Sequence, residues 1–190
     1  MPPAAEELRV GRRSIEISSP AKSLFPKPRI TKLELARHYE AVAEAMLPHV
    51  RGRPLALEGY PRGIDGPGFY MKEAPAHFPG WIERARMPKH GGSVNHVIAA
   101  DAATLVYLAS QNVITPHVWL SRADEPRRPD RLIVDFDPSP GVGFATIRAA
   151  SREAGARLRD AGLATFAMVT GSRGIHVVAP LKRTAEHAEV

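Results

Sequence analysis

The segment from residue 132 to residue 180 constrains the fold most. An apolar run that ends in two aspartates, Leu132–Asp137, is followed by the turn-forming run Pro138–Gly141. An amphipathic stretch, Phe144–Asp160, then leads into a second apolar run, Ala164–Val169. Short apolar runs bounded by proline and glycine are typical of buried strands, and the spacing between them predicts a helix. The segment therefore predicts a strand–helix–strand unit within a mixed α/β fold.

Two acidic residues, Asp135 and Asp137, lie at the carboxyl end of the first of these strands. Side chains two residues apart on a strand point to the same face, so we expect both carboxylates on one face and Phe136 on the other. Carboxylates this close repel each other unless a cation lies between them. Mg²⁺ or Mn²⁺ bound together with substrate phosphates is the usual arrangement. The alternative is a pair of solvated acids at a strand end.

A glycine-containing loop, Thr170–Gly174, follows the second strand. Its two glycines allow backbone N–H groups to converge on an anion, and Ser172 and Arg173 are further donors. The alternative is an ordinary hairpin turn. Because one strand–helix–strand unit separates the loop from the aspartates, the sequence predicts metal carboxylates beside a phosphate-binding loop. Two histidines in strand-like segments, His117 and His176, are often structural when considered singly, but their association with these elements favours ligand contact.

Two further pairs of residues are candidates for nucleic-acid contact. Phe69 and Tyr70 are adjacent on a strand, so we expect one in the core and the other exposed, where it can stack on a base. Simple core packing is the alternative. Lys22 and Lys32 flank a proline-rich loop, and lysine at a helix start opposes the helix dipole. No local stabilisation explains Lys32, whereas a bound phosphate would; the alternative is a solvated lysine.

The rest of the chain predicts short strands and three more helices, one of them short, in one domain, 1–190. We divide it into an N-terminal arm or hairpin (1–20), a nucleic-acid-contacting part (21–127) and a metal- and nucleotide-binding part (128–190). The further elements expected are a hairpin (8–10 with 14–17), a helix that begins with a Thr31–Glu34 capping box and stops before Pro48, strands at 55–60 and 69–72, a loop at 74–92 with a short helix around Trp81, a strand at 94–99, a helix from Asp101 through Ala109, and strands at 113–120 and 175–179.

Composition excludes several classes of protein. The chain has no cysteine, so disulfides and thiolate metal sites are ruled out. Its formal net charge is +6, which favours an anionic partner such as nucleic acid or nucleotide, although an arginine-rich composition also follows from GC-rich coding. No N-terminal signal peptide or apolar membrane span is evident, so a cytoplasmic protein is expected and no membrane partner.

Several motifs together resemble the polymerase domain of bacterial ATP-dependent DNA ligase D, in the archaeo-eukaryotic primase superfamily. The strongest are RPDRLIVDFDPSPGVGF (Arg128–Phe144) and TGSRGIHVVAPL (Thr170–Leu181) in this order and spacing. Three further stretches, LFPKPRITK (Leu24–Lys32), LPHVRGRPL (Leu47–Leu55) and PHVWLSR (Pro116–Arg122), agree with the resemblance.

The resemblance implies template-directed nucleotide addition at broken or gapped DNA in non-homologous end joining, with ribonucleotides and Mn²⁺ favoured. It also implies partners: DNA ends with a 5′-phosphate, nucleoside triphosphates, attached ligase and nuclease domains, and a Ku-type end-binding protein, in the bacterial nucleoid. By resemblance the site residues are the metal carboxylates Asp135 and Asp137; the nucleotide-binding His117, Thr170, Ser172, Arg173, Gly174 and His176; the 5′-phosphate-binding Lys22 and Lys32; and the template-stacking Phe69 and Tyr70.

The chain departs from the family pattern in three respects. The family uses a third aspartate beyond the glycine loop, and this sequence ends at Val190 before reaching it. We therefore expect a primase–polymerase-type domain that is incomplete at its C-terminus, and leave open whether it is an enzyme. Glu58 and Gly59 stand where members commonly have basic residues, and Thr170 replaces a usual serine.

Two alternatives compete with a polymerase. A catalytically deficient module that binds DNA ends and 5′-phosphates is favoured by the missing third carboxylate, but it has no use for the Asp pair. A haloacid-dehalogenase phosphatase also has a strand that ends in Asp-x-Asp. In those phosphatases Gly-Thr or Gly-Val follows the second Asp, and the motif lies near the start of the domain. In this chain Pro138 and Ser139 follow the second Asp, and the motif lies late in the sequence.

Overall fold

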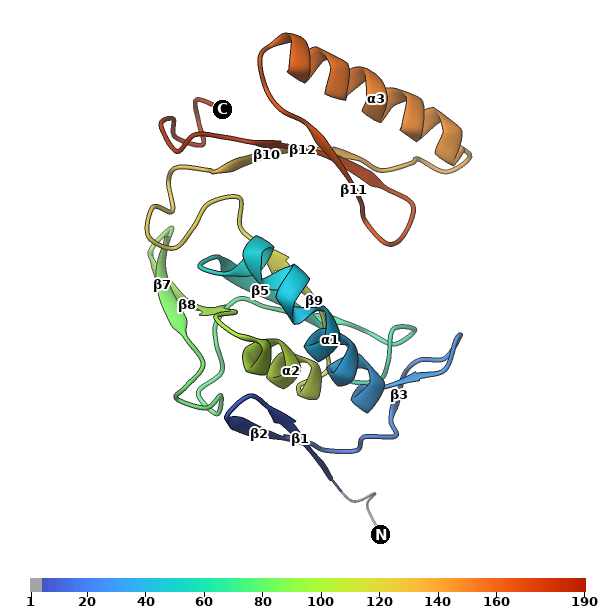
Figure 1. The fold of residues 1–190 in the computed structure, drawn as a ribbon, viewed down its shortest axis with the longest axis vertical. Coiled ribbons are helices and arrows are strands. Elements are labelled where there is room, and N and C mark those ends of the chain that lie inside the picture. The colour runs from blue at the N-terminus through green and yellow to red at the C-terminus, as the bar shows by residue number, and fades with distance from the viewer. Residues whose placement is uncertain (1–4) are drawn as a thin grey trace. The chain divides into compact units, whose positions relative to one another are not determined.

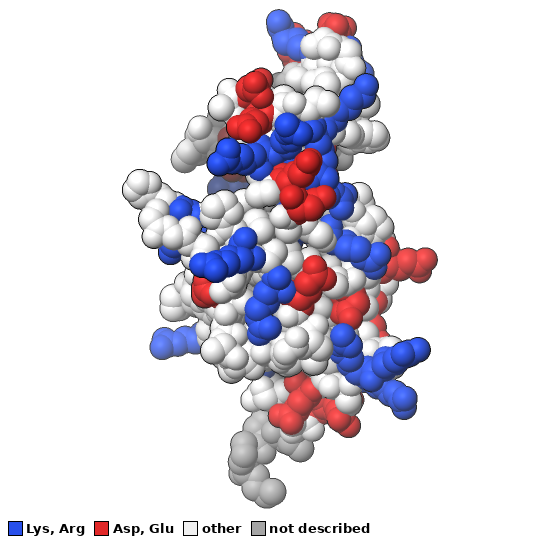
Figure 2. Space-filling model, turned by 90° about the vertical axis from the view of Figure 1, so that its left-hand side faces the viewer, with Lys and Arg blue, Asp and Glu red and all other residues white. Residues whose placement is uncertain are grey.

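The computed structural model describes residues 5–190, which form two compact units, one ending at Trp119 and the other running from Leu120 to Val190. Figure 1 shows the helices and strands of each unit. No helix in the described part of the chain is long and apolar enough to span a lipid bilayer. In the face shown in Figure 2, basic and acidic side chains are interspersed, so the net positive charge is not gathered there into one patch.

The first unit packs two helices against a five-stranded sheet and a small hairpin. Its elements are β1 (Glu6–Val10), β2 (Arg13–Ile17), β3 (Ser23–Phe25), β4 (Ile30–Thr31), α1 (Lys32–Val50), β5 (Pro54–Gly59), β6 (Phe69–Met71), β7 (Arg84–Lys89), β8 (Gly92–Ile98), α2 (Ala102–Ser110) and β9 (Val113–Val118). Strand β5 is central, pairing antiparallel with β6, β8 and β9. The helices α1 and α2 lie side by side (Figure 1). Leu55 and Leu57 of β5 are fully buried in this core.

Local signals placed the starts of both helices correctly. The Thr31 hydroxyl accepts a hydrogen bond from the Glu34 N–H, and the Glu34 carboxylate accepts one from the Thr31 N–H at 2.7 Å, which confirms the capping box. The Asp101 carboxylate accepts from the Thr104 N–H at 2.8 Å and caps α2. The predicted end of α1 was wrong, because the helix continues through Pro48 to Val50. Burial of Val50 at the end of the helix favours this last turn despite the missing proline N–H.

The predicted short helix around Trp81 was also wrong. That stretch forms turns, and the residues after it form β7, which pairs with β8 in a hairpin. Charged residues and Pro88 obscured the strand in the sequence, although Met87 is buried in the expected alternation. Strand β7 lies at the edge of the sheet, where a proline costs no ladder hydrogen bond.

The second unit contains the strand–helix–strand segment expected from the sequence. Its elements are β10 (Arg131–Phe136), α3 (Phe144–Asp160), β11 (Phe166–Val169) and β12 (Ile175–Pro180), with β12 between β10 and β11 in an antiparallel sheet. Helix α3 lies along one face of this sheet (Figure 1). Its C-terminus closes with the Gly162 N–H donating to Arg159 and the Leu163 N–H donating to Leu158, and Gly162 has a φ of +86°.

The buried face of α3 is narrow. Buried residues are Ile147, Ser151 and Gly155, whereas Phe144 is 54% exposed and Leu158 is half-buried. The narrow stripe follows from small side chains at 151 and 155, which let the helix backbone approach the sheet: a Cβ added at Gly155 would lie 3.8 Å from Val177. All four residues of β11 are exposed.

The buried Tyr39 predicts a measurable pH dependence of stability. Its hydroxyl donates to the Ile114 carbonyl, and burial raises its pKa from 10.0 to about 12. Because the folded chain holds this proton more tightly than the unfolded chain does, wild-type stability should fall as pH rises above about 10. Replacing Tyr39 by Phe should cost about 1 kcal/mol at neutral pH and remove that fall. Denaturant unfolding of the wild type and of Tyr39→Phe at about pH 8 and about pH 11 measures this effect. An equal fall in the free energy of unfolding of both proteins between these pH values would contradict the prediction.

Candidate nucleotide- and metal-binding site

The two predicted metal carboxylates lie on the face of the second sheet that α3 does not cover. In the β10–β12 register, Asp135 is opposite His176 and Phe136 is opposite the buried Ile175. Asp137 follows the end of β10 and rests against the backbone of Gly174: a Cβ built there would lie 2.5 Å from its Oδ1 atom. Since φ at Gly174 is ordinary, the backbone would accept another residue here, but an added side chain would displace the Asp137 carboxylate.

His176 contacts the first carboxylate directly. Its Nε2 atom lies 3.1 Å from Oδ1 of Asp135, whose side chain is 53% exposed. The other ring nitrogen, Nδ1, is buried without a hydrogen-bond partner. The exposed edge of the imidazole is therefore the one that faces Asp135, and His176 fixes the orientation of that carboxylate.

The loop between β11 and β12 closes on itself and presents its tip to solvent. The Thr170 N–H donates to the Gly174 carbonyl at 3.2 Å, and the Gly174 N–H donates to the Thr170 hydroxyl at 3.1 Å. Gly171 takes a φ of +84°, which glycine adopts readily. Ser172 and Arg173 at the tip are exposed. Thr170 thus holds the loop closed, while the exposed Ser172 and Arg173 side chains are accessible to an anion.

The donor set fits one divalent cation. Two carboxylates on one strand end supply hard oxygen ligands of the kind that Mg²⁺ and Mn²⁺ prefer, with room for water and phosphate oxygens. Within residues 5–190 no group of three or more His, Cys, Asp or Glu side chains is placed to hold a metal. Asp135 and Asp137 are therefore the residues that would bind the ion.

His117 lies in the first unit, in a cluster built around Glu58. The Glu58 carboxylate accepts hydrogen bonds from the Tyr60 hydroxyl at 2.6 Å and from the His117 Nε2 atom at 2.8 Å. The ring of Tyr70 lies against that of His117, with centroids 5.5 Å apart. These hydrogen bonds, that of Tyr60 first, lower the pKa of Glu58. The sequence pointed to Glu58 only as a departure from a family pattern, and gave no sign that it is the centre of this cluster.

The aromatic pair differs from its prediction in one respect. Tyr70 is 64% exposed, as expected of a residue that stacks on a base, but Phe69 is also 37% exposed and does not lie in the core. Phe69 covers Gly59 instead, where an added Cβ would lie 2.5 Å from its ring. Strand β6 is only three residues long and lies at the sheet edge, so neither of its faces is fully covered.

The two lysines are close together, and one has a structural role that the sequence concealed. Lys32 is 3% exposed, and its Nζ atom donates to the carbonyl of Ser110, the last residue of α2, at 3.1 Å and to the Ser18 hydroxyl at 3.2 Å. Its charge therefore meets the negative end of α2, which is a tertiary contact and not a local one. The alternative of a solvated lysine was wrong, because the side chain is buried. Burial and the nearby Lys22 charge lower the pKa of Lys32.

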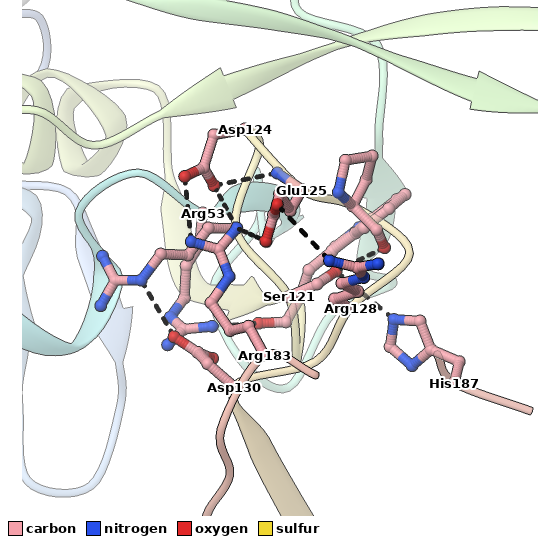
Figure 3. Close-up of polar contacts among 11 residues, drawn as sticks. Arg53, Ser121, Asp124, Glu125, Arg128, Asp130, Arg183 and His187 are labelled. Carbon is pink, nitrogen blue, oxygen red and sulfur yellow. Dashed lines mark hydrogen bonds and ion pairs between the residues drawn. The ribbon is translucent and has the colours of Figure 1, made fainter. Parts of the chain in front are cut away.

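The C-terminal segment holds the loop that precedes β10. Arg183 makes two hydrogen bonds to the Asp124 carboxylate, at 2.7 and 3.0 Å (Figure 3). The backbone N–H of His187 donates to the Arg127 carbonyl. Arg122 contacts Asp130 at 2.9 Å just before that strand. The entry to β10, and with it the Asp pair, is thus anchored within the second unit.

Comparison with known proteins identifies the family. The model of the LigD primase-polymerase domain matches residues 31–190. The chain belongs to this family. It is 33% identical over 175 residues to the multifunctional non-homologous end joining DNA repair protein LigD of Mycobacterium tuberculosis, covering 88% of this chain, and 30% identical over 178 residues to LigD of Pseudomonas aeruginosa, covering 92%.

A solved structure agrees with the family assignment. The polymerase domain of Mycobacterium tuberculosis ligase D in complex with DNA matches with a TM-score of 0.82 and 32% identity, over 87% of this chain and 61% of that one. This confirms the expected mixed α/β primase–polymerase fold. The chain spans 23% of the length of the M. tuberculosis LigD protein and 21% of the P. aeruginosa one.

Proposed function

We propose that this LigD-family domain catalyses template-directed nucleotidyl transfer, filling gaps or extending ends at DNA double-strand breaks in bacterial non-homologous end joining. The single observation that carries the proposal is Asp137 resting against Gly174 beside the Asp135–His176 pair, which joins two carboxylates to a phosphate-binding loop. The M. tuberculosis polymerase domain solved with DNA supports DNA as the partner. Ribonucleoside triphosphates and Mn²⁺ are the proposed substrates and metal, and ligase, nuclease and Ku-type proteins the proposed partners.

Each group of residues has a proposed task. Ser172, Arg173 and the backbone N–H groups of the glycine loop bind the triphosphate, because exposed donors at a glycine turn suit phosphate oxygens. Asp135 and Asp137 bind the cation, which when present neutralises phosphate charge. His117 contacts the nucleotide, Tyr70 stacks on the template base, and Lys22 and Lys32 bind the 5′-phosphate of the downstream strand. In the reaction the primer 3′-hydroxyl attacks the α-phosphorus, and pyrophosphate leaves with the broken bond's electrons.

The test is extension of a gapped duplex that carries a downstream 5′-phosphate, with Mn²⁺ and ribonucleotides. We expect template-matched addition by the wild-type chain and a loss of at least about a hundredfold when Asp135 and Asp137 are both replaced by Asn, since the carboxylate charges are removed at constant volume. Asp160→Asn, an exposed acid at the end of α3, is the matched control and should leave addition unchanged. Addition that survives the double replacement would refute the assignment.

A second function is favoured by one observation, the lack of a third ligand beside the Asp pair among the described residues. A module that binds DNA ends and 5′-phosphates without catalysis would show no extension in the same assay. It would still bind duplex ends with an affinity that falls steeply with salt, and this binding would survive the Asp replacements.

A further inference from the structure

The structure places an acidic side chain, Glu58, at the centre of the sheet face that carries His117. Strands β6, β5 and β9 bring Glu58 opposite Tyr70 on one side and opposite Thr115 on the other. His117 lies two residues further along β9, and so on the same face as Thr115. Leu55 and Leu57 of β5 point the other way into the core. The face therefore presents a carboxylate, an imidazole and phenol rings away from the core.

The carboxylate of Glu58 is fully engaged by its neighbours. One oxygen accepts from the Tyr60 hydroxyl and the other lies 2.8 Å from His117 Nε2. Its side chain is 16% exposed, whereas that of His117 is 45% exposed. Glu58 is thus surrounded by donors and is not itself open to a ligand, but the histidine that it holds is.

These contacts determine which ring nitrogen carries the proton. An ionised carboxylate has no proton to donate, so the nitrogen beside it must donate. The lowered pKa of Glu58, caused first by Tyr60 and next by His117, keeps the carboxylate ionised at neutral pH. His117 therefore carries a proton on Nε2, and the neutral ring has Nδ1 as its remaining acceptor.

We propose that Glu58 is a positioning residue of the nucleotide site: it holds His117 in the Nε2–H tautomer and leaves Nδ1 to accept a hydrogen bond from an N–H or O–H donor of the bound nucleoside. The nucleotide part of this assignment rests on the proposed function. The tautomer part rests only on the Glu58–His117 contact. Tyr70 limits the rotation of the same ring from its other side, since the two rings pack at 5.5 Å.

The first measurement is the tautomer of His117, from long-range ¹H–¹⁵N correlation spectra, with His117→Gln used to assign its signals among the eight histidines. We expect the Nε2–H form in the wild-type chain and a mixture of tautomers in Glu58→Ala. Glu58→Gln should largely retain the Nε2–H form, because the amide oxygen still accepts from the ring. An unchanged tautomer in folded Glu58→Ala would overturn the proposal.

The second measurement is the affinity for ATP with Mn²⁺ by calorimetry. Glu58→Ala should weaken binding about tenfold, the effect of one lost hydrogen bond to a charged group, and Glu58→Gln much less. In a His117→Ala background, Glu58→Ala should cause no further loss, because Glu58 acts through the histidine. Equal losses in both backgrounds would overturn the positioning role. A wild-type chain that binds no ATP would refute the proposed function, while the tautomer spectra would still decide what Glu58 does to His117.

Discussion

Replacing Gly174 by Ala is expected to lower nucleotide addition about a hundredfold while leaving the fold intact. The added Cβ would lie 2.5 Å from Oδ1 of Asp137, closer than real Cβ atoms approach, and 3.1 Å from the Thr170 side chain, which is a tight contact. Since φ at Gly174 is ordinary, the backbone accepts alanine, and the Asp137 carboxylate is the group that must move. A displacement of about 1 Å at a reacting centre can cost about a hundredfold in rate.

The measurement compares template-matched extension and Mn²⁺–ATP affinity in wild type and Gly174→Ala, with unfolding monitored in parallel. Gly80→Ala is the matched control, because Gly80 has an ordinary φ and no atom within 4 Å of the added Cβ. Asp137 could also be displaced by damage to the loop as a whole. Thr170→Ser tests this, since it keeps the hydroxyl that holds the loop closed and should retain activity. Wild-type activity in Gly174→Ala would mean that Asp137 does not need its present position.

Local features of this fold were predictable because the residues that determine them are neighbours in sequence. The Thr31–Glu34 capping box needs only four residues, and it was confirmed with its hydrogen bonds. The Asp135–Asp137 pair needs only the two-residue period of a strand, and its position beside the Thr170–Gly174 loop follows from one antiparallel pairing. In each case the spacing of the interacting residues can be taken directly from the sequence.

The wrong or missed predictions concern features that depend on residues far apart in the sequence. Helix α1 continues past Pro48 because Val50 is buried there, and nothing near Pro48 in the sequence reports that burial. Lys32 appeared to oppose its own helix, yet it satisfies the C-terminus of another helix 78 residues away at Ser110. Glu58 is likewise separated by 59 positions from His117, its partner in the candidate nucleotide site. Tertiary contacts of this kind give charged residues roles that spacing alone does not reveal.

The two lysines near α1 lead to the last prediction, in which binding and stability change in different directions. On the proposed assignment of Lys22 and Lys32 to the 5′-phosphate, a recessed DNA end that carries this phosphate should bind at least about tenfold more tightly than the same end with a 5′-hydroxyl, because lysine forms charge-assisted hydrogen bonds to phosphate. Lys22→Met should abolish this preference without destabilising the chain.

The stability prediction follows from the pKa of Lys32, which burial and the repulsive charge of Lys22 both lower. Because replacing Lys22 by Met relieves this repulsion, the free energy of unfolding at neutral pH should stay equal or rise. If Lys22 had a purely structural role, its replacement would instead lower the free energy of unfolding. Lys27→Met, which removes an equal charge from an exposed site in the turn between β3 and β4, is the control and should keep the preference. The folded state holds the Lys32 proton less tightly than the unfolded state does. The contribution of Lys32 to stability should therefore rise as pH approaches 10.5 from below, opposite in sign to that of Tyr39, and should rise less in Lys22→Met. Competition binding with the two DNA ends measures the preference, and unfolding curves at several pH values measure the stability. A 5′-phosphate preference that survives Lys22→Met would show that the assignment of the two lysines to the 5′-phosphate is wrong.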